Sequence, residues 1–256
     1  MSSVFTWLND PSHWRDDPST SFVGIPTEIV THLRFSAIAV GIALAIALPA
    51  GLAIGHSGRA TWVVSLVNAV RSIPAVGLLV LLAVIISPHF FGRTDLGYLI
   101  PTEIVLVLIA MPAILANTHA GVDAVDPAVR DAARGMGMTG RDVLLRVELP
   151  NSLPLIFSGV RSATLQVIAT ATIASYFPLG GLGRYIYDGF HQQDYAQMVS
   201  GGVLVAVLAV LVDFVMAIAQ RLAVSPGVSG RFSKKTATPA DAAMGSVRIK
   251  GEVATG

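Results

Sequence analysis

An aspartate inside a long apolar run is the residue with the clearest capacity for chemistry in this sequence. Asp213 directly follows the uncharged stretch 195–212. A carboxylate within such a run is usually paired with a cation or takes part in moving a solute or a proton. Asp213 could line a pathway or set a gate against Arg161 or Arg221. The alternative is that it lies near the end of its helix and simply reaches an aqueous interface.

The residue types that covalent catalysis or metal binding would need are missing or scattered. The chain has no Cys, which excludes disulfide bonds, thiolate nucleophiles and Cys-ligated metals. No carboxylate pair, His cluster or nucleophile elbow falls on one predicted helix face, so we expect neither an enzyme nor a bound metal. His119 has no neighbour that would make it a metal ligand.

A glycine-rich stretch could be taken for a nucleotide-binding loop. It runs Gly180-Gly181-Leu182-Gly183, but it lacks the strand and helix that surround a dinucleotide fingerprint. The phosphate loop G-x-x-x-x-G-K-[ST] is also missing from the sequence. We therefore expect these glycines to permit a tight external turn or close helix packing. We therefore expect no cofactor to bind this chain.

The composition indicates which elements must position these residues. Of 256 residues, 53% are hydrophobic and 13% are charged, against about 25% charged in a typical soluble domain. The mean hydropathy is +0.67. These values exclude a disordered chain. The near balance of 17 basic and 16 acidic residues argues against nucleic-acid binding.

Five apolar stretches predict transmembrane helices. A helix needs about 20 apolar residues to cross a bilayer core of roughly 30 Å. Because backbone amides in lipid must be satisfied within their own segment, helices are favoured over open sheet. The predicted fold class is an all-α membrane protein with five transmembrane helices, in a domain at 35–222. The spans are 35–54, 72–91 with a backward extension through 62–70, 104–120, 162–183 and 195–212, the last continuing past Asp213 to 219.

The two ends of the chain differ from the spans. Residues 1–34 hold Trp7 and Trp14 among acidic residues, which predicts an external segment with a short interfacial helix. Residues 223–256 are rich in Gly, Ser, Thr, Ala and Lys, which predicts a disordered cytoplasmic tail. Lys and Arg in short loops remain cytoplasmic. With the C-terminus inside, 13 of the 17 basic residues fall on the inner side, so we expect the N-terminus outside.

Other residues within the spans have simpler interpretations. Asn68, Gln166 and Thr170 are expected to hydrogen-bond between helices. Glu103 should mark the outer boundary of the third span. Prolines kink a helix because the ring removes a hydrogen bond and clashes with the preceding turn. Three fall inside the predicted spans, at Pro49, Pro74 and Pro112.

The long polar loop 121–154 breaks the pattern of short connections. Asp126 and Pro127 suit the N-cap and the first position of a helix, which we expect over 128–136. Gly137 follows where a left-handed residue would end that helix.

A second short helix is predicted directly afterwards. Thr139 can cap it, with Asp142 in the favoured acidic position three residues later. Leu149-Pro150 should end it, because the residue before a proline is pushed out of helical geometry. Two short helices around a glycine corner would form a rigid L-shaped projection. An ordinary amphipathic loop is the alternative.

The same loop carries a spaced motif. Asp131-Ala132-Ala133 is followed after three residues by Gly137, and after nine more by Val147-Glu148-Leu149-Pro150. This resembles the EAA motif of ABC importer permeases, which is Glu-Ala-Ala, three residues, Gly, nine residues, Ile-x-Leu-Pro. Asp131 for Glu and Val147 for Ile are mild departures. The resemblance implies that the loop is a coupling helix docking on a separate ATPase. The implied coupling residues are Asp131, Ala132, Ala133, Arg134, Gly135, Gly137, Leu149 and Pro150.

More of the chain, roughly residues 28–228, resembles the osmoprotectant branch of these permeases, which imports glycine betaine, carnitine or choline. Phe177-Pro178-Leu179 departs from it, because this segment is usually small and glycine-rich, and Arg184 replaces a usually acidic residue. The stretches that carry the resemblance are 28–34, Arg71-Ser72-Ile73-Pro74 with 78–82, Arg134-Gly135-Met136-Gly137-Met138-Thr139-Gly140, Ala174-Ser175-Tyr176, Gly180-Gly181-Leu182-Gly183 and 212–227.

The resemblance implies a type I ABC importer permease fold in the bacterial cell membrane. The implied partners are an ABC ATPase subunit that uses the ATP, an external substrate-binding protein, and a second permease that is either a copy or a relative. Membrane lipid surrounds the chain. The implied gate or pathway residues are Arg71, Pro74, Gln166, Gly181, Gly183 and Asp213.

Two alternatives remain open from the sequence. The first is a permease for methionine or another small polar solute, which would share the coupling motif. The second is a stand-alone channel or secondary transporter, for which inverted repeats or several intramembrane charges would be expected. The sequence has no convincing repeat, and Asp213 is nearly alone in its run.

Overall fold

Helices make up nearly all of the secondary structure of this chain. The computed structural model describes residues 2–19, 22–90 and 95–223, so the predicted tail lies outside the described residues except for Ala223. The β-structure within these ranges is a lone antiparallel bridge between Asp17 and Phe22. The longest helices are α2 (Ile25–Ser57), α5 (Leu96–Asp123), α8 (Leu149–Thr170) and α10 (Tyr195–Ala223).

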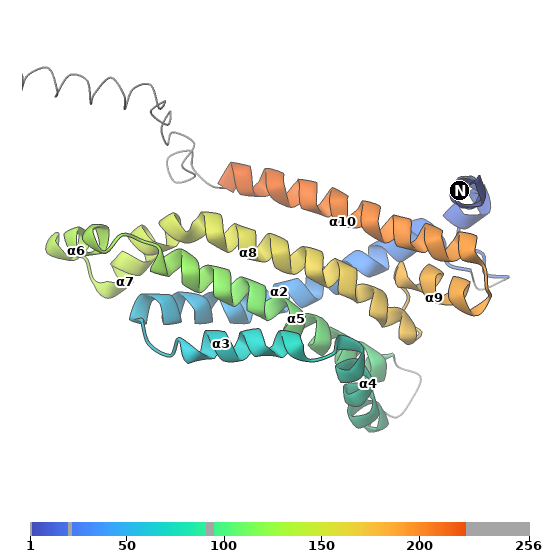
Figure 1. Cartoon of the computed structure of the whole chain (residues 1–256), viewed down its shortest axis with the longest axis horizontal. Helices are drawn as coiled ribbons and strands as arrows, with labels where there is room; N and C mark the ends of the chain where they lie inside the picture. Colours follow the sequence, from blue (N-terminus) through green and yellow to red (C-terminus); the bar gives the residue numbers. More distant parts are fainter. Residues whose placement is uncertain (1, 20–21, 91–94, 224–256) are drawn as a thin grey trace, which may run out of the picture. The chain divides into compact units, whose positions relative to one another are not determined.

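The shorter helices connect or flank the long ones. In Figure 1 the long helices run side by side, with α6 and α7 at one end and α9 and the N-terminus at the other. The shorter α-helices are α1 (Ser2–Asn9), α3 (Trp62–Ala69), α4 (Ala75–Ile86), α6 (Pro127–Gly135), α7 (Gly140–Val143) and α9 (Gly183–His191). The 3-10 turns are η1 (Pro11–Trp14), η2 (Val70–Ser72), η3 (Ser87–His89) and η5 (Ala171–Tyr176), and η4 (Leu144–Glu148) is a π-turn.

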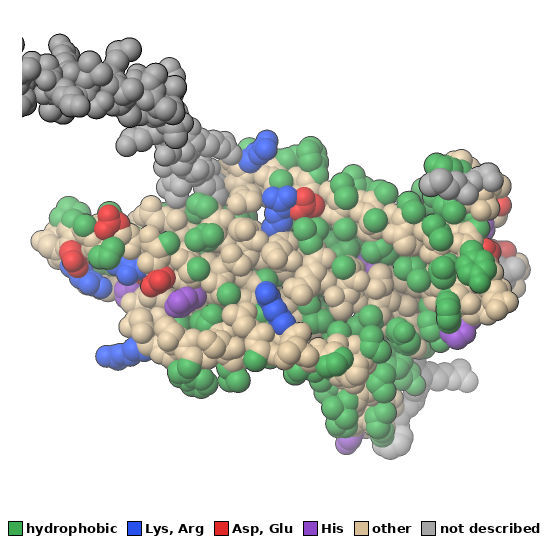
Figure 2. Space-filling view, viewed as in Figure 1, with side chains coloured by type: hydrophobic (Ala, Val, Ile, Leu, Met, Phe, Trp, Pro, Cys, Tyr) green, Lys and Arg blue, Asp and Glu red, His purple; other side chains and the backbone are tan. Residues whose placement is uncertain are grey.

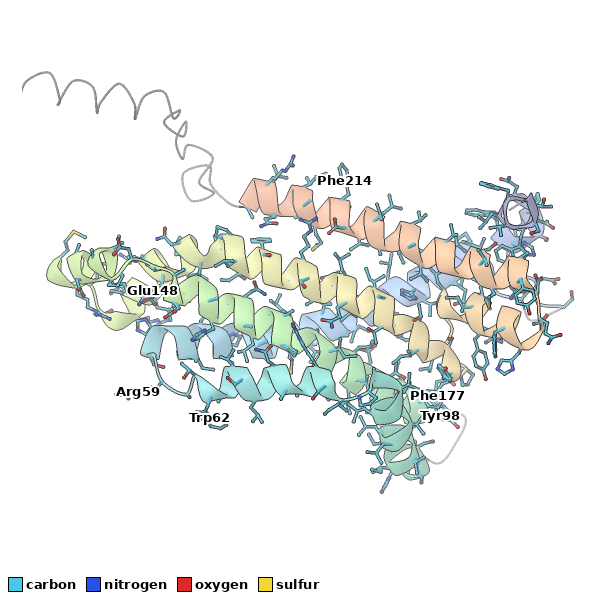
Figure 3. The ribbon with its side chains drawn as sticks, viewed as in Figure 1. Arg59, Trp62, Tyr98, Glu148, Phe177 and Phe214 are labelled. Atoms are coloured by element: carbon cyan, nitrogen blue, oxygen red, sulfur yellow. The ribbon has the colours of Figure 1, made fainter. Side chains whose placement is uncertain are left out.

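The predicted fold class is confirmed. Within the described residues, four helical segments are long and apolar enough to cross a membrane, namely Ile25–Ser57, Leu96–Asp123, Gly140–Tyr176 and Tyr195–Ala223. A fifth span is obtained when the bent pair of α3 and α4 counts as one. Hydrophobic side chains cover the exposed sides of α4 and α10 (Figure 2), and Phe214 projects away from α10 (Figure 3). Such faces suit contact with lipid or with another apolar chain.

The second predicted span is not one straight helix. The sequence predicts a helix over 72–91 with an extension through 62–70, whereas the chain turns by 90° between α3 and α4. Ile73 is extended, with φ −78° and ψ 127°, because the ring of Pro74 disfavours helical geometry at the residue before it. The predicted kink at Pro74 is therefore a complete break.

Other prolines lie within continuous helices. Pro49 is inside α2 and Pro112 is inside α5. Pro150 also lies in a helical segment, which runs on from Gly140 to Tyr176, so the prediction that Leu149-Pro150 ends a helix is wrong. The π-turn η4 directly precedes Pro150. Its wider i→i+5 bonding, in which Leu149 donates, makes room for a ring that an α-turn would exclude.

The fourth predicted span, 162–183, begins and ends too late. Its helix is part of the segment Gly140–Tyr176, whose last turns are the 3-10 helix η5. Phe177 is extended, with φ −115° and ψ 162°, because Pro178 follows it. A turn then leads into α9, which begins at Gly183.

Two other helices are longer than the apolar runs that predicted them. α2 begins at Ile25, so residues 25–34 of the predicted external segment belong to the first long helix. α5 extends beyond 104–120 at both ends, which places Glu103 inside the helix rather than at its boundary. Both carboxyl oxygens of Glu103 are buried without a hydrogen-bond partner in the described part of the chain.

Small residues allow the long helices to approach closely. On α2, every fourth residue over 39–55 is a buried Ala or Gly. A Cβ on Gly51 would lie 2.7 Å from Cβ of Thr118, and a Cβ on Gly55 would lie 2.7 Å from Cβ of Val122. Close backbone approach is the usual source of helix association in lipid. The stripe packs α2 against α5, which in turn packs against α8.

The N-terminal segment packs on α9 and α10. Trp7 is 8% exposed and lies between His13, whose ring stacks at 4.1 Å, and Tyr185, at 5.4 Å. The Tyr185 hydroxyl donates to the carbonyl of Val23 at 2.6 Å. The predicted short helix is confirmed as α1, but Trp7 packs inside the chain instead of facing an interface, whereas Trp14 is exposed.

Candidate functional site

The first half of the spaced motif lies on α6, between α5 and α7. The carboxylate of Asp126 accepts the N–H of Ala128 at 2.8 Å, and Pro127 takes a first-turn position that needs no N–H. The start of this helix is where the sequence predicts it.

Gly137 ends α6 in the left-handed conformation, with φ +86°. Its N–H bonds to the carbonyl of Arg134 at 2.9 Å, and the N–H of Met138 bonds to the carbonyl of Ala133 at 3.2 Å. This pair of bonds is the Schellman pattern that closes a helix. A Cβ on Gly137 would meet nothing within 4 Å, so φ rather than space requires glycine. The predicted glycine corner is confirmed.

A capping box starts α7 directly after this corner. The Thr139 hydroxyl accepts the N–H of Asp142 at 3.2 Å, and the Asp142 carboxylate accepts the N–H of Thr139 at 3.3 Å. The two short helices of the L-shaped projection are thus both fixed by local bonds. The projection differs from the prediction at its far end, where α7 continues through η4 into α8.

The surface of α6 carries most of the predicted coupling residues. Those that are exposed are Asp131, Ala132, Arg134 and Gly135. Exposed Val129 and Met136 add apolar area beside them. Ala133, in contrast, is 3% exposed, so its small side chain serves the packing of α6 on its own chain. The resulting surface combines both charges with apolar patches.

A cluster of ionisable side chains around one buried carboxylate lies behind α6, and the sequence analysis does not foresee it. Glu148 is 1% exposed and lies at the junction of α6, α7 and α8 (Figure 3). Its Oε1 is 3.0 Å from Nε of Arg130, and its Oε2 is 2.6 Å from Nδ1 of His56. We call these three residues the Glu148 cluster. The motif spacing marks Glu148 only as a variable position, and nothing local links it to His56. Leu149 and Pro150 beside it are half-buried.

Asp213 pairs with Arg161 rather than with Arg221. Nε and Nη2 of Arg161 donate to Oδ1 and Oδ2 of Asp213, at 2.5 and 2.6 Å. The bidentate pair joins α8 to α10, and both side chains remain about one third exposed, at 37% and 31%. Its possible role in a pathway or gate stays a prediction.

The glycine stretch forms a tight turn between η5 and α9. Gly180 and Gly181 have φ of +80° and +90°. The Glu28 carboxylate accepts the N–H of Gly181. His32, one turn further along α2, lies with Nε2 2.9 Å from the carbonyl of Ile168. The first turns of α2 therefore contact both the glycine turn and the end of α8, and both predicted roles of the glycines, turn and close packing, occur.

Gly183 illustrates the close packing. A Cβ at this position would overlap the carbonyl oxygen of Thr172 and lie 2.8 Å from its Cα. Phe177 and Leu179, which depart from the osmoprotectant pattern, also pack against other parts of the same chain. The Phe177 ring stacks on Tyr98 at 4.8 Å (Figure 3), and Leu179 packs against the core of the long helices.

The remaining predicted gate residues are not brought together by this chain. Arg71 and Pro74 are exposed at the break between α3 and α4, and Gln166 is exposed on α8. The predicted interhelical hydrogen bonds of Asn68, Gln166 and Thr170 are absent among the residues that the structure describes. Within the same residues, no group of three His, Asp or Glu side chains could hold a metal ion.

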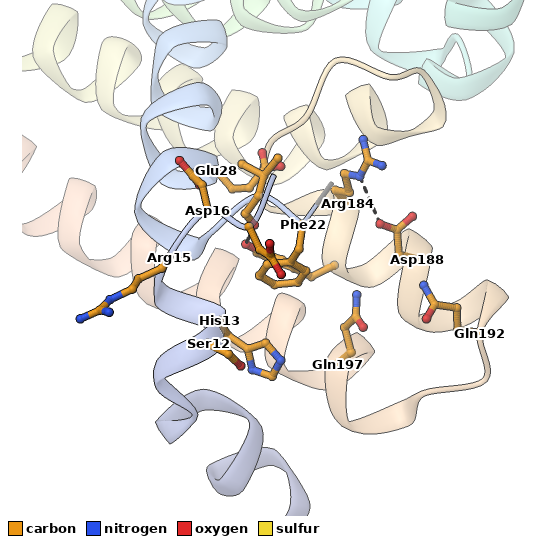
Figure 4. Close-up of a pocket in the computed structure, with 13 residues that line it drawn as sticks. Ser12, His13, Arg15, Asp16, Phe22, Glu28, Arg184, Asp188, Gln192 and Gln197 are labelled. Carbon is orange, nitrogen blue, oxygen red and sulfur yellow. Dashed lines mark hydrogen bonds and ion pairs between the residues drawn. The ribbon is translucent and has the colours of Figure 1, made fainter. Parts of the chain in front are cut away.

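A cavity of about 650 Å³ lies between the N-terminal segment, α9 and α10 (Figure 4). Its wall includes the carboxylates of Asp16 and Glu28 and the ion pair of Arg184 with Asp188, at 3.1 Å. Tyr185 also lines it, and burial, followed by the nearby Glu28 carboxylate, raises the pKa of this phenol, so the hydroxyl stays protonated. Arg184, the second departure from the osmoprotectant pattern, thus lies on the cavity wall.

Known proteins similar to this chain include members of one transport family. The family described as "Binding-protein-dependent transport system inner membrane component" matches residues 43–225, which include the whole of α6 and α7. The glycine betaine/carnitine/choline transport system permease protein OpuCB of Bacillus subtilis (strain 168) is 32% identical over 200 residues, 78% of this chain and 88% of that protein. The carnitine transport permease protein OpuCB of Listeria monocytogenes is 37% identical over 186 residues, 72% of this chain and 81% of that protein.

The fold has a counterpart among solved structures. A chain of the MetNI methionine ABC transporter in an inward-facing conformation superposes with a TM-score of 0.63 at 22% identity. The superposition covers 77% of this chain and 94% of that chain. The fold is therefore that of a type I ABC importer permease.

Proposed function

Because this chain belongs to the family of binding-protein-dependent transport system inner membrane components, we propose that it forms the membrane pathway of an importer for osmoprotectants such as glycine betaine, choline or carnitine. In this proposal a separate ABC ATPase drives transport, and an external substrate-binding protein delivers the solute. A second permease, either a copy or a relative, completes the pathway. In the same proposal, the ATPase site belongs to the partner subunit, and this chain needs no cofactor of its own.

The observation that carries the proposal is the geometry of α6. Its Asp126 cap, its Schellman ending at Gly137 and the capping box of α7 define the two short helices through bonds between residues close in sequence. The outer face then offers the exposed pair of Asp131 and Arg134, 3.6 Å apart, next to exposed Met136. A rigid helix with a mixed charged and apolar face suits docking into a groove of a partner, because little order is lost on binding.

The choice of solute is supported by the relatives, whose names include glycine betaine, carnitine and choline transport. The likeness to the methionine transporter, at 22% identity, supports the fold only. The gate or pathway roles of Arg71, Pro74, Gln166, Gly181, Gly183 and Asp213 belong to this proposal as well.

The orientation that we propose has the N-terminus outside and the C-terminus in the cytoplasm. Basic residues gather at the α6 end of the chain, where Arg59 (Figure 3), Arg130 and Arg141 lie, and basic loops remain cytoplasmic. The opposite end carries the acidic residues Asp16 and Asp188. Because the chain has no Cys, a single Cys at exposed Ser12 or Arg141 is a unique label. A membrane-impermeant thiol reagent on intact cells should label Ser12→Cys and spare Arg141→Cys.

The test of the function is reconstitution. The tagged chain is purified from native membranes in mild detergent, and co-purifying proteins are identified by mass spectrometry. The complex is then placed in liposomes with the binding protein, and uptake of labelled glycine betaine, choline, carnitine and methionine is measured with and without ATP. We expect an ATPase to co-purify and uptake of a quaternary amine to require ATP.

Other results have defined meanings. ATP-dependent uptake of methionine alone would replace the solute and keep the importer. Uptake that needs no ATP, or purification without any ATPase, would contradict the proposal and favour a channel or secondary transporter.

A further inference from the structure

The Glu148 cluster joins four helical elements at one buried point. Glu148 lies on the π-turn η4 at the root of α8, His56 lies in the last turn of α2, and Arg130 lies in the middle of α6. Arg130 also donates from Nη2 to the carbonyl of Val122, near the end of α5. Each carboxylate oxygen of Glu148 thus has its own partner from a different element.

Burying a carboxylate at this junction costs free energy that an apolar side chain would not cost. A buried carboxylate loses its hydration, and a buried ion pair is often no more stabilising than apolar side chains of similar volume. In exchange, the cluster can hold its elements in one relative arrangement, because two short contacts must form together. Nδ1 of His56 is hydrogen-bonded to Oε2 of Glu148 at 2.6 Å, and Nε of Arg130 lies 3.0 Å from Oε1 as an ion pair without hydrogen-bond geometry. The side chains of His56 and Arg130 are only 25% and 18% exposed, so solvent screens these bonds little.

The cluster also connects the two halves of the spaced motif. Arg130 directly precedes Asp131 in the first half, and Glu148 lies inside the second half, between Val147 and Leu149. The π-turn that ends at Glu148 is the local irregularity of an otherwise continuous helical segment, and π-turns frequently mark functional positions. The exposed face of α6 is therefore connected to α2, α5 and α8 through the polar contacts of Arg130 and Glu148 as well as through the packing of α6.

We propose that Glu148 is a positioning residue for energy coupling, which holds α6 in one orientation relative to α2 and α8 so that a displacement of α6 moves the long helices with it. This inference rests on the proposed function, in which α6 docks on an ATPase. Without the Glu148 carboxylate, α6 would still form, because its caps are local, but it would adopt a range of orientations.

The first test measures orientation without any transport assay. In the full-length chain, which has no native Cys, spin labels are placed on Arg59→Cys beyond the end of α2 and on Asp131→Cys on α6, both of which are exposed. Pulsed electron paramagnetic resonance then gives the distribution of distances between the labels. We expect a narrow distribution in the parent and a broad one in Glu148→Gln. An unchanged distribution in Glu148→Gln would overturn the proposal.

The second test measures coupling in the complete importer. Solute transported per ATP hydrolysed should fall about fivefold or more in Glu148→Gln, which corresponds to the loss of a typical coupling free energy. Co-purification of the ATPase should be retained, because the exposed face of α6 is unchanged. His56→Asn, which can place an amide nitrogen near the position of Nδ1, should retain more coupling than His56→Leu.

A matched control distinguishes the effect of the polar contacts on the orientation of α6 from the effect of side-chain packing. In the triple variant Glu148→Leu, Arg130→Met and His56→Leu, the three ionisable side chains are replaced by apolar side chains of similar size. Such a replacement often leaves the stability of a protein unchanged or raises it. We expect this variant to fold, to show a broad distance distribution and to be uncoupled. A folded triple variant with parental distances and parental coupling would overturn the proposal. If the importer proved not to use ATP, the distance measurement would still decide the positioning role.

Discussion

The backbone N–H of Gly181 donates a hydrogen bond to the carboxylate of Glu28, a residue 153 positions earlier in the chain. Glu28 is buried in the first turn of α2, and Gly181 lies in the left-handed turn that leads into α9. The contact fixes the turn against the first long helix, and Glu28 also lines the cavity in Figure 4. The turn therefore depends on α2 as well as on its own glycines.

Removal of the Glu28 carboxylate should loosen this turn. In Glu28→Ala the buried N–H of Gly181 loses its acceptor, which costs about 1–3 kcal/mol. In Glu28→Gln the amide oxygen can still accept that bond, so stability should stay near the parental value. The melting temperatures of both variants are measured in detergent, with size-exclusion chromatography used to detect the folded fraction after heating. Equal melting temperatures for the two variants would contradict the assigned contact.

Gly183 should tolerate no side chain. A Cβ there overlaps the backbone of Thr172, so Gly183→Ala should destabilise the chain by about 1–3 kcal/mol through overpacking. Gly41 on α2 is the matched control, because a Cβ there meets nothing within 4 Å. Gly41→Ala should be neutral or stabilising by up to about 1 kcal/mol. The same thermal assay compares them, and a Gly183→Ala chain as stable as Gly41→Ala would show that the turn is not packed as described.

Gly137→Asp should stop uptake by the reconstituted importer. Both Asp and Asn are among the residues that best tolerate a positive φ, so Gly137→Asn carries a similar backbone strain without the charge. The expected order of uptake is parent, then Gly137→Asn, then Gly137→Asp, with a similar, small loss of thermal stability in both variants because both carry the same backbone strain. Normal uptake by a well-folded Gly137→Asp protein would remove Gly137 from the proposed ATPase contact.

Gly135 allows a test of contact that is independent of backbone strain. It lies in the last turn of α6, is exposed, and a Cβ there would meet nothing within 4 Å of the chain itself. Gly135→Ala should therefore stabilise the isolated permease by up to about 1 kcal/mol, as expected for a helix interior. Because the proposal places a partner against this face, the same variant should lower the amount of ATPase recovered by pull-down. Unchanged recovery would show that the partner does not approach Gly135.

Removal of one partner of the Arg161–Asp213 pair should lower both stability and uptake, because the remaining charge loses its partner. Asp213→Asn leaves the guanidinium without its bidentate partner between α8 and α10, so we expect a lower melting temperature and reduced uptake. Arg221→Gln is the control, because Arg221 is exposed near the end of α10. Exchange of the two charges, Arg161→Asp with Asp213→Arg, should recover part of the stability. Parental behaviour of Asp213→Asn would rule out a structural or gating role for the pair.

Much of the projection that carries α6 could be predicted from the sequence. Asp126, Gly137 and the pair of Thr139 and Asp142 act on backbone groups within a few residues of themselves, so their types and spacing suffice to predict caps and corner. Apolar run length predicts helices for the same kind of reason, since each helical bond is local. The prediction that a helix ends at Leu149-Pro150 is wrong, because the π-turn η4 relieves the clash between the proline ring and the preceding turn.

The sequence alone is enough to predict a set of membrane helices, the start and end of α6, the start of α7 and the family motif. The 90° turn between α3 and α4, the pairing of Asp213 with Arg161 and the contact of Glu148 with His56, 92 positions earlier in the chain, follow from the tertiary structure. These contacts join helices that are far apart in sequence, and the alanine and glycine stripe of α2 sets how closely two of those helices approach. The packing of the helices decides which side chains from distant parts of the chain meet. The sequence pattern of one helix does not show how that helix is aligned along its neighbour.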